Sequence, residues 1–308
     1  MKTCLVTGGA GFIGSHLIAG LLAEGWTINV LDDFATGKRE NLAPFGRRIR
    51  VFDGSVTLPS DVAAATAGAD TVFHLAALPS VALSIADPVS MHEICATGTL
   101  NVLKAARDGG VRRVVYASTA AAYGDQEGEL RRETDPLIPL SPYAAAKLAG
   151  EHYCSCFTAV YGLETVRLRF FNVFGPRQDP KSPYTGVIAI FLSALAENRV
   201  PTIFGDGLQA RDFVYVENIV RGIMLAASSA DANGRVYNLG MGAATTLLDL
   251  VRDLNTLLGT EIVPHHAPAR PGDIRHSQAD ISAARRDLLY APSIPLIEGL
   301  RKTIAAAG

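Results

Sequence analysis

Three evenly spaced glycines near the start of the chain constrain its fold more than any other feature. Gly8, Gly11 and Gly14 follow an apolar run that ends at Val6, and Phe12 begins a helical apolar stripe. Glycines between a strand and a helix permit a tight turn, and they let backbone N–H groups approach a pyrophosphate at the positive end of the helix. The motif therefore predicts a dinucleotide site where the first strand meets the first helix.

Asp32 supplies the second half of this signal. It stands at the end of the second predicted strand, 18 residues after Gly14. A carboxylate there can accept hydrogen bonds from the adenosine ribose, and its charge repels a 2′-phosphate. The cofactor is therefore predicted to be NAD and not NADP. The alternative is that these three glycines are ordinary turn residues and that Asp32 is an exposed acid in a loop.

The pattern of short β-branched runs and longer helical stretches predicts an α/β fold. Alternation of this kind gives parallel strands joined by right-handed crossovers, with helices on both faces. We expect a doubly wound parallel (Rossmann) sheet in an NAD-binding domain over residues 1–172. A smaller mixed α/β substrate-binding lobe should cover 173–308, with some chain crossing back. The predicted strands are 3–6, 28–31, 49–52, 71–74, 113–117 and 165–168, and the later helices are 188–197, 217–227, 247–258 and 295–305.

Length and charge limit the classes of function. The 308 residues exceed the roughly 250–300 at which a single core stops growing, so a large domain with an appendage is expected. With a net charge of −2, the chain has no large positive potential that would attract nucleic acid or an anionic membrane. The amino-terminal apolar stretch is too short for a secretory signal, and no run of about 18 apolar residues could span a membrane. We expect a cytoplasmic protein without nucleic-acid or membrane partners.

The four cysteines do not indicate a metal site. Cys4, Cys95, Cys154 and Cys156 are accompanied by no His or Cys cluster at zinc-ligand spacing. Free thiols in a reducing compartment are expected, and no metal is predicted. Cys154 and Cys156 are interpreted as core residues.

Tyr143 and Lys147 form the predicted catalytic pair. Ser141 is a natural N-cap and Pro142 a natural first helical residue, so a helix should place Tyr143 and Lys147 one turn apart on one face. A free phenol has a pKa of about 10, and a nearby ammonium and a positive nicotinamide favour its ionised form. Tyr143 could then accept a proton from an alcohol while hydride leaves the same carbon. A surface helix pair is the alternative.

A hydroxyl pair, Ser118 and Thr119, follows the fifth predicted strand. Ligands of doubly wound sheets bind at the carboxyl edge of the strands, which is where this pair should lie. Thr119 could hydrogen-bond the oxygen that passes between alcohol and ketone. The alternative role is a helix cap or a strand-end hydroxyl.

Together these features resemble the extended short-chain dehydrogenase/reductase family over nearly the whole chain. The resemblance implies catalytic roles for Thr119, Tyr143 and Lys147. The matching segments are TGGAGFIG at 7–14, HLAA at 74–77, YG at 123–124, PY at 142–143, Lys147, RFFNVFGP at 169–176 and RDF at 211–213. The implied cofactor contacts are Gly8, Gly11, Phe12, Ile13, Gly14, Asp32, Asp33, Ser55, Val56, Leu75, Ala76, Ala77, Tyr143 and Lys147. The implied substrate contacts are Ser118, Thr119, Asn172, Val187, Ile188, Arg211, Arg270, Asp273 and Ser277.

The residues after Thr119 narrow the implied reaction. Dehydratases and decarboxylases of this family carry an acidic residue shortly after that hydroxyl, because their chemistry needs a further acid or base. Here residues 120–122 are all alanine. The resemblance then implies a UDP-hexose 4-epimerase, which oxidises C4, forms a transient 4-keto sugar and returns hydride to its other face. It also implies a homodimer built through two helices per subunit, one of which contains Tyr143.

Ser277 bears on the size of the sugar. In this family the matching position borders the C2 substituent, and a bulky aromatic there confines an epimerase to UDP-glucose and UDP-galactose. Serine leaves room for an N-acetyl group, so UDP-GlcNAc and UDP-GalNAc are expected substrates as well. Two departures from the family pattern, Ser55 in place of an acid and Cys95 in place of an asparagine, bear on cofactor affinity.

Two other functions stay open at this point. A UDP-glucuronate 4-epimerase would need a polar or positive cradle for the C6 carboxylate, which Arg177 or Thr185 could provide. A non-catalytic NAD-sensing module is the other possibility, since folds of this type also serve as regulators. Retention of Thr119, Tyr143 and Lys147 favours an enzyme.

Overall fold

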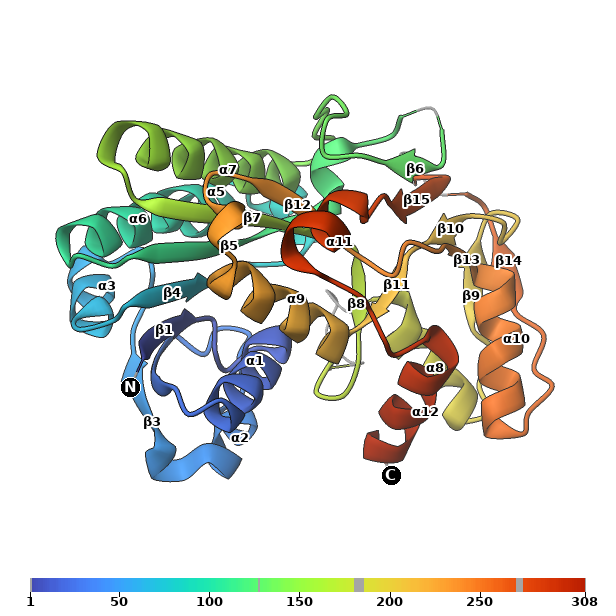
Figure 1. Ribbon diagram of the computed structural model, residues 1–308. Helices are drawn as coiled ribbons and strands as arrows, with labels where there is room; N and C mark the ends of the chain where they lie inside the picture. Colours follow the sequence, from blue (N-terminus) through green and yellow to red (C-terminus); the bar gives the residue numbers. More distant parts are fainter. Residues whose placement is uncertain (1, 127, 180–185, 270–273, 308) are drawn as a thin grey trace.

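The computed structural model describes residues 2–126, 128–179, 186–269 and 274–307. A seven-stranded, wholly parallel sheet forms its centre, with the strand order β12-β7-β5-β4-β1-β2-β3 (Figure 1). The predicted doubly wound sheet is confirmed. Its strands are β1 (Thr3–Thr7), β2 (Thr27–Asp32), β3 (Ile49–Asp53), β4 (Thr71–His74), β5 (Arg113–Thr119), β7 (Glu164–Phe170) and β12 (Val236–Leu239).

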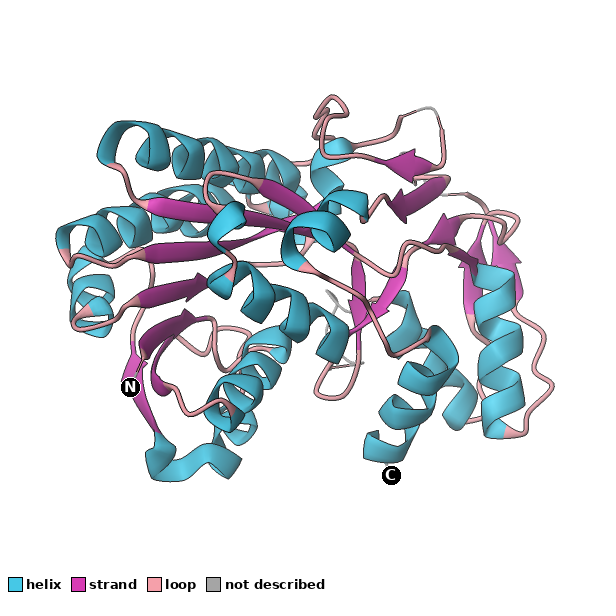
Figure 2. Ribbon diagram, viewed as in Figure 1, coloured by secondary structure: helices cyan, strands magenta, loops and turns pink. Residues whose placement is uncertain are grey.

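Helices cover both faces of this sheet (Figure 2). On one face α3, α6 and α7 pack against one another, and on the other α1 packs against α9. Central strands are therefore apolar on both sides: in β1, Leu5 belongs to one core, whereas Cys4 and Val6 belong to the other. The helices are α1 (Phe12–Ala23), α3 (Pro59–Thr66), α6 (Gly98–Asp108), α7 (Pro142–Tyr161) and α9 (Val216–Ser228).

The order of the strands places a crevice beside β1. From β1 the chain proceeds to β2 and β3 on one side, then crosses to β4, β5 and β7 on the other. In open α/β sheets ligands bind at such a switch point, outside the carboxyl ends of the strands. The glycine motif follows β1 at this edge, and His74 ends β4 beside it.

A smaller mixed α/β lobe is built from short strands and further helices, around a core of its own. Its three longer helices, α8, α10 and α12, lie together at the lower right of Figure 1. The strands are β6 (Leu130–Arg131), β8 (Asn172–Phe174), β9 (Thr202–Phe204), β10 (Ala210–Arg211), β11 (Phe213–Tyr215), β13 (Thr245–Thr246), β14 (His265–Ala267) and β15 (His276–Ala279), and the helices are α8 (Val187–Ala196), α10 (Leu247–Leu258) and α12 (Leu296–Ala307).

Beyond residue 172 the chain returns to the large sheet. Helix α9 packs on α1, and β12 pairs in parallel with β7 at the sheet edge. The sequence pattern did not indicate β12, because it is a four-residue run that carries the polar Asn238. Its strand conformation depends on pairing with β7, some 70 residues earlier. The boundary at 172/173 stays a prediction, since α9 and β12, which follow it, lie with the large sheet, and β6, which precedes it, pairs with β15.

The cysteine prediction holds for one member of the close pair and fails for the other. Cys154 is buried in the core under α7, but Cys156 is exposed. The two residues are two apart on a helix, so they face different sides, and only one side meets the sheet. Among the described residues no helix is long and apolar enough to cross a membrane, and no His, Cys, Asp and Glu side chains cluster as metal ligands would.

Candidate active site

A cleft of about 880 Å³ opens at the carboxyl edge of the large sheet, where the crevice was expected. It brings together residues from β2, β5, β7, β8, α1 and α7 and from the loops that follow β1 and β4. The residues predicted from sequence that line it are Gly8, Gly11, Phe12, Ile13, Gly14, Asp32, Asp33, Val56, Leu75, Ala76, Ala77, Ser118, Thr119, Tyr143, Lys147 and Asn172. Most of the predicted cofactor and catalytic residues therefore share one cavity.

The glycine motif forms one wall of the cleft. Helix α1 begins after Gly11, a residue without a side chain to cap the first turn, so the first backbone N–H groups face the cavity. A β-carbon on Gly14 would overlap the carbonyl oxygen of Gly8, so only glycine permits this tight turn. Free N–H groups at the positive end of a helix suit a pyrophosphate. These residues fit a dinucleotide.

Asp32 is held rigidly at the end of β2. Its Oδ2 accepts from the Ala10 N–H at 2.8 Å, and its Oδ1 accepts from the Phe34 N–H at 2.9 Å. Burial raises the pKa of this carboxyl, and the two N–H groups oppose that shift. Because each carboxylate oxygen has a second lone pair, Asp32 can still accept hydrogen bonds from a ribose.

Ser55 stands just outside the cleft lining. Its hydroxyl donates to Asp33 Oδ2 at 3.4 Å, and Asp33 does line the cleft. Ser55 therefore reaches the cleft lining through Asp33, and its predicted contact with the cofactor stays a prediction. Cys95 is fully buried and contacts the sulfur of Met91 at 3.6 Å, behind the wall of the cleft and not on its surface.

Helix α7 presents Tyr143 and Lys147 to the cleft as predicted. Ser141 caps it by accepting from the Ala144 N–H at 3.2 Å, and Pro142 is its first residue. Lys147 is buried, and its Nζ lies 4.3 Å from the centre of the Tyr116 ring. Thr119 ends β5 in the same cavity, where its hydroxyl accepts from the Ala121 N–H at 3.1 Å.

The electrostatics of the pair differ from the sequence-based expectation. Burial raises the pKa of Tyr143 above its usual range, and a hydrogen bond to Thr119 opposes that shift. Burial also lowers the pKa of Lys147. Desolvation, and not the neighbouring amine, therefore sets the direction of the Tyr143 pKa shift. The positive charge of a bound nicotinamide would favour the phenolate.

Ser118 is committed to a partner inside the protein. Its hydroxyl donates to Glu151 Oε1 at 2.5 Å, and its side chain is buried. Ser118 therefore lines the cleft, but its hydroxyl hydrogen is already donated to the Glu151 carboxylate. The predicted contact with substrate stays a prediction.

The predicted substrate residues are spread over the smaller lobe. Asn172 begins β8 at the cleft, while Val187 and Ile188 begin α8, with Ile188 buried in the core of that lobe. Arg211 and Ser277 are paired neighbours on β10 and β15 and lie outside the cleft lining. Arg270 and Asp273 lie outside the described residues.

Backbone hydrogen bonds connect these strands. The Asn172 N–H donates to the Asp212 carbonyl at 3.0 Å, and the Asp212 N–H donates to the Ser277 carbonyl at 2.8 Å. Ser277 is thus held two backbone hydrogen bonds away from Asn172, which lines the cleft.

Several residues that line the cleft were not predicted. Lys38 follows β2, and its Nζ lies 2.7 Å from Asp179 Oδ2, which comes from the loop after β8. Gln178 lines the cleft beside it. The sequence offers only a weak signal for this pair, the Gly37-Lys38 step after Asp32, because the two partners are 141 residues apart.

Comparison with known proteins identifies close relatives. A family model described as "NAD dependent epimerase/dehydratase family" matches residues 4–240. A UDP-glucose 4-epimerase of Mycolicibacterium smegmatis is 38% identical over 308 aligned positions, and the match covers 99% of this chain and 97% of that protein.

Two solved structures have the same fold over nearly their whole length. A UDP-N-acetylglucosamine 4-epimerase from Methanobrevibacter ruminantium, in complex with UDP-N-acetylmuramic acid, is 37% identical with a TM-score of 0.95; the match covers 99% of this chain and 98% of that one. A UDP-glucose 4-epimerase from Thermus thermophilus, in complex with NAD, is 38% identical with a TM-score of 0.90 and the same coverage.

Proposed function

The chain belongs to the NAD-dependent epimerase/dehydratase family, and we propose that it interconverts the C4 epimers of a UDP-hexose through a transient 4-keto sugar. NAD is its cofactor, as the family requires and as the glycine motif and Asp32 fit. The family includes dehydratases, so the choice of reaction rests on the site.

One observation carries the choice of epimerisation. Among the described residues that line the cleft, the carboxylates are Asp32, Asp33 and Asp179. Asp32 ends β2 and Asp33 follows it, at the proposed adenosine end, and Asp179 is paired with Lys38. Residues 120–122, which follow Thr119, are alanines. Dehydration needs an additional acid or base near the sugar, whereas epimerisation needs only the group that moves the C4 hydroxyl proton.

The side chains at the cleft have distinct roles in this reaction. Tyr143, as phenolate, takes the proton from the C4 hydroxyl and later gives it back. Thr119 hydrogen-bonds the same oxygen, and the Lys147 ammonium stabilises the phenolate. Bound NAD supplies the acceptor, and afterwards the donor, of the C4 hydride. Because proton and hydride both return to the sugar, the net change is inversion at C4.

Ser277 supports acceptance of N-acetylated sugars. Its small side chain stands on β15 next to Arg211. We propose that this position borders the C2 substituent, where a bulky residue would reduce the space for an N-acetyl group. The similarity to a UDP-N-acetylglucosamine 4-epimerase is in keeping with this proposal. We therefore include UDP-GlcNAc and UDP-GalNAc among the substrates, beside UDP-glucose and UDP-galactose.

The second candidate is UDP-glucuronate 4-epimerisation. Arg177 lines the cleft and could meet a C6 carboxylate. Its guanidinium, however, lies over the Phe45 ring at 6.0 Å. Thr185, the other residue proposed for this role, lies outside the described residues.

A panel of substrates tests the proposed function. The purified protein is incubated separately with UDP-glucose, UDP-GlcNAc and UDP-glucuronate, and the products are separated as C4 epimers. Inversion of the first two is expected. Turnover of UDP-glucuronate alone would establish the second candidate, formation of a 4-keto-6-deoxy product would establish a dehydratase, and no turnover with retained NAD binding would indicate a sensing module.

We also propose a homodimer. Helices α4 (Val81–Ala86) and α5 (Pro88–His92) pack against α7, and together they expose the large apolar side chains of Ile85, Val89 and Val160. A second copy of this face would remove them from water. Light scattering coupled to gel filtration should give twice the 32.6 kDa chain mass, and a monomer would contradict the proposal.

A further inference from the structure

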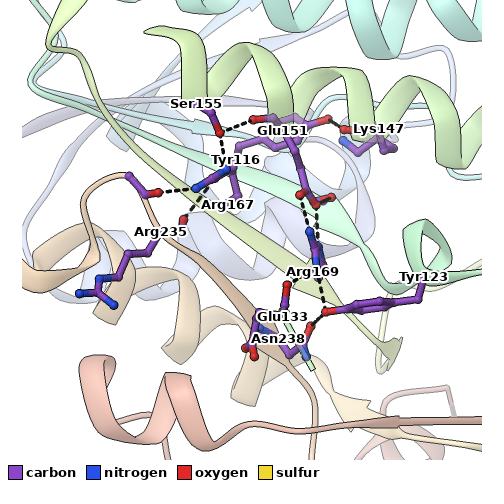
Figure 3. A network of polar contacts seen from close by, with 12 residues as sticks. Tyr116, Tyr123, Glu133, Lys147, Glu151, Ser155, Arg167, Arg169, Arg235 and Asn238 are labelled. Atoms are coloured by element: carbon purple, nitrogen blue, oxygen red, sulfur yellow. Dashed lines mark hydrogen bonds and ion pairs between the residues drawn. The ribbon is translucent and has the colours of Figure 1, made fainter. Parts of the chain in front are cut away.

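A buried ion pair between Glu151 and Arg169 lies one helical turn beyond Lys147 of α7 (Figure 3). Arg169 of β7 donates to Glu151 through Nε, 2.9 Å from Oε1, and through Nη2, 2.7 Å from Oε2. Each side chain is only 3% exposed. Such a bidentate pair fixes both the distance and the plane of its partners.

Glu151 also joins two strands. Ser118 and Arg169 are register partners on β5 and β7, and the Glu151 carboxylate accepts a hydrogen bond from both of them. Ser118 immediately precedes Thr119. A single carboxylate on α7 therefore bridges the ends of the two strands that lead into the cleft.

The same helix carries the catalytic pair. Tyr143, Lys147 and Glu151 are spaced four apart, so they lie along one face of α7. This face approaches β5 closely, because a β-carbon on Gly150 would overlap the Tyr116 hydroxyl. The rotation and height of α7 on the sheet therefore decide where Tyr143 stands relative to Thr119.

We propose that Glu151 is a positioning residue, whose carboxylate fastens α7 to the ends of β5 and β7 and so sets the separation of Tyr143 and Thr119. It acts through the helix and does not touch the reacting atoms. Arg169 is in turn held from behind: its Nη1 donates to the Tyr123 hydroxyl at 2.9 Å, and that hydroxyl donates to Asn238 Oδ1 at 2.7 Å. The strand β12, which carries Asn238, thereby supports the ion pair between Arg169 and Glu151.

The main test is E151Q, measured as kcat and KM for UDP-glucose. Glutamine has nearly the same size, but its NH₂ group would face the donors of Arg169. We expect kcat to fall about 10- to 100-fold, with KM within about 2-fold of the wild type, because displacement of a catalytic group lowers the rate more than binding.

The chain offers a matched control at the other end of the same strands. Arg113 of β5 and Glu164 of β7 are also register partners, and Arg113 Nε lies 2.8 Å from Glu164 Oε2. These residues begin their strands, far from the carboxyl edge. E164Q should lower thermal stability while leaving kcat within about 2-fold of the wild type, the scatter expected away from the site.

A second variant keeps the test valid if E151Q folds poorly. The double substitution E151M/R169M removes both charges, and such replacements of buried ion pairs by apolar residues are often neutral for stability. We expect it to fold and to retain the low kcat, because Ser118 has still lost its acceptor. Recovery of wild-type kcat would show that Glu151 only neutralises Arg169 and would overturn the proposal.

The structural readout does not depend on the proposed function. In crystals of the NAD-bound double variant, the distance between Thr119 Oγ1 and the Tyr143 hydroxyl should change by about 0.5 Å or more relative to the wild type, the tolerance of a catalytic constellation. An unchanged distance overturns the inference even if kcat falls. If the wild type is inactive on every UDP-sugar, only the proposed function is refuted. The distance between Thr119 Oγ1 and the Tyr143 hydroxyl still tests the role of Glu151.

Discussion

Tyr116 of β5 holds Lys147 of α7 in two ways. Its hydroxyl donates to the Lys147 carbonyl at 3.0 Å, and its ring centre lies 4.3 Å from Lys147 Nζ. The first contact fixes the backbone of the helix against the strand. The second places an aromatic face beside a buried ammonium, an attraction of about 0.5–2 kcal/mol that offsets part of the desolvation. Lys147 is thus located by a strand residue that is not part of the cleft lining.

Replacing Tyr143 by phenylalanine should remove the acid–base group while preserving the packing of α7. We expect kcat to fall about 100- to 10,000-fold, the usual contribution of such a group. Bound NAD, measured by absorbance after release, should stay at the wild-type level. Wild-type turnover in Y143F would refute the assignment of Tyr143.

The pH dependence should reveal the link between Lys147 and the phenol. Since burial raises the pKa of Tyr143, turnover should rise with pH as the phenol ionises. Removing the ammonium in K147M should move this rise upward by about 1–3 pH units, the size expected for a neighbouring charge. K104M, an exposed lysine paired with Asp108 on α6, is the control and should leave the profile unchanged. Identical profiles for all three proteins would contradict the role of Lys147.

Asp32 should decide both the strength and the kind of cofactor binding. Asp32 accepts hydrogen bonds from the N–H groups of Ala10 and Phe34, and in D32N one of these two N–H groups loses its acceptor. NAD affinity should fall about 10- to 100-fold, as expected for hydrogen bonds to a charged group. D70N is the matched control, because Asp70 accepts from the Thr3 N–H at the opposite edge of the sheet. Calorimetric titration with NAD and NADP measures both effects, and equal affinity of the wild type for the two would disprove the discrimination.

Ser277 should control acceptance of the N-acetyl group. S277Y is expected to keep UDP-glucose turnover within about 3-fold and to lose UDP-GlcNAc turnover by about 100-fold or more, the selectivity that steric exclusion at a pocket can provide. UDP-glucose turnover is the internal control for folding. Parallel losses on both sugars would mean that Ser277 does not border the C2 substituent.

His74 should make the fold sensitive to acid. Burial lowers its pKa from 6.5 to about 3, while its ring nitrogens contact the hydroxyls of Thr7 and Thr99. As the pH falls below about 6.5, His74 binds a proton in the unfolded chain but stays neutral in the folded chain, so the free energy of unfolding decreases. Between pH 7 and pH 5 this loss should be about 2 kcal/mol. Urea unfolding of H74N should show a smaller difference between the two pH values, and an equal difference would exclude His74 as the cause.

The sequence by itself determined the features that depend on local spacing. The strand, glycine turn and helix at the amino terminus, Asp32 at the end of β2, and the Tyr143–Lys147 pair all follow from backbone periodicity and turn chemistry. These features place the cofactor cleft and name its central residues. The two-sided burial of β1 was likewise predictable, because a parallel strand covered on both faces must be apolar throughout.

Only the tertiary structure decided which distant surfaces meet. The strand β12 forms because it pairs with β7. Glu151 contacts Ser118 and Arg169 because α7 packs across β5 and β7. Neither fact has a local signal, since each depends on the packing of segments far apart along the chain. The pKa of Tyr143 likewise depends on how deeply its side chain is buried. Sequence spacing carries no information on burial, so the effect of desolvation on this phenol became evident only in three dimensions.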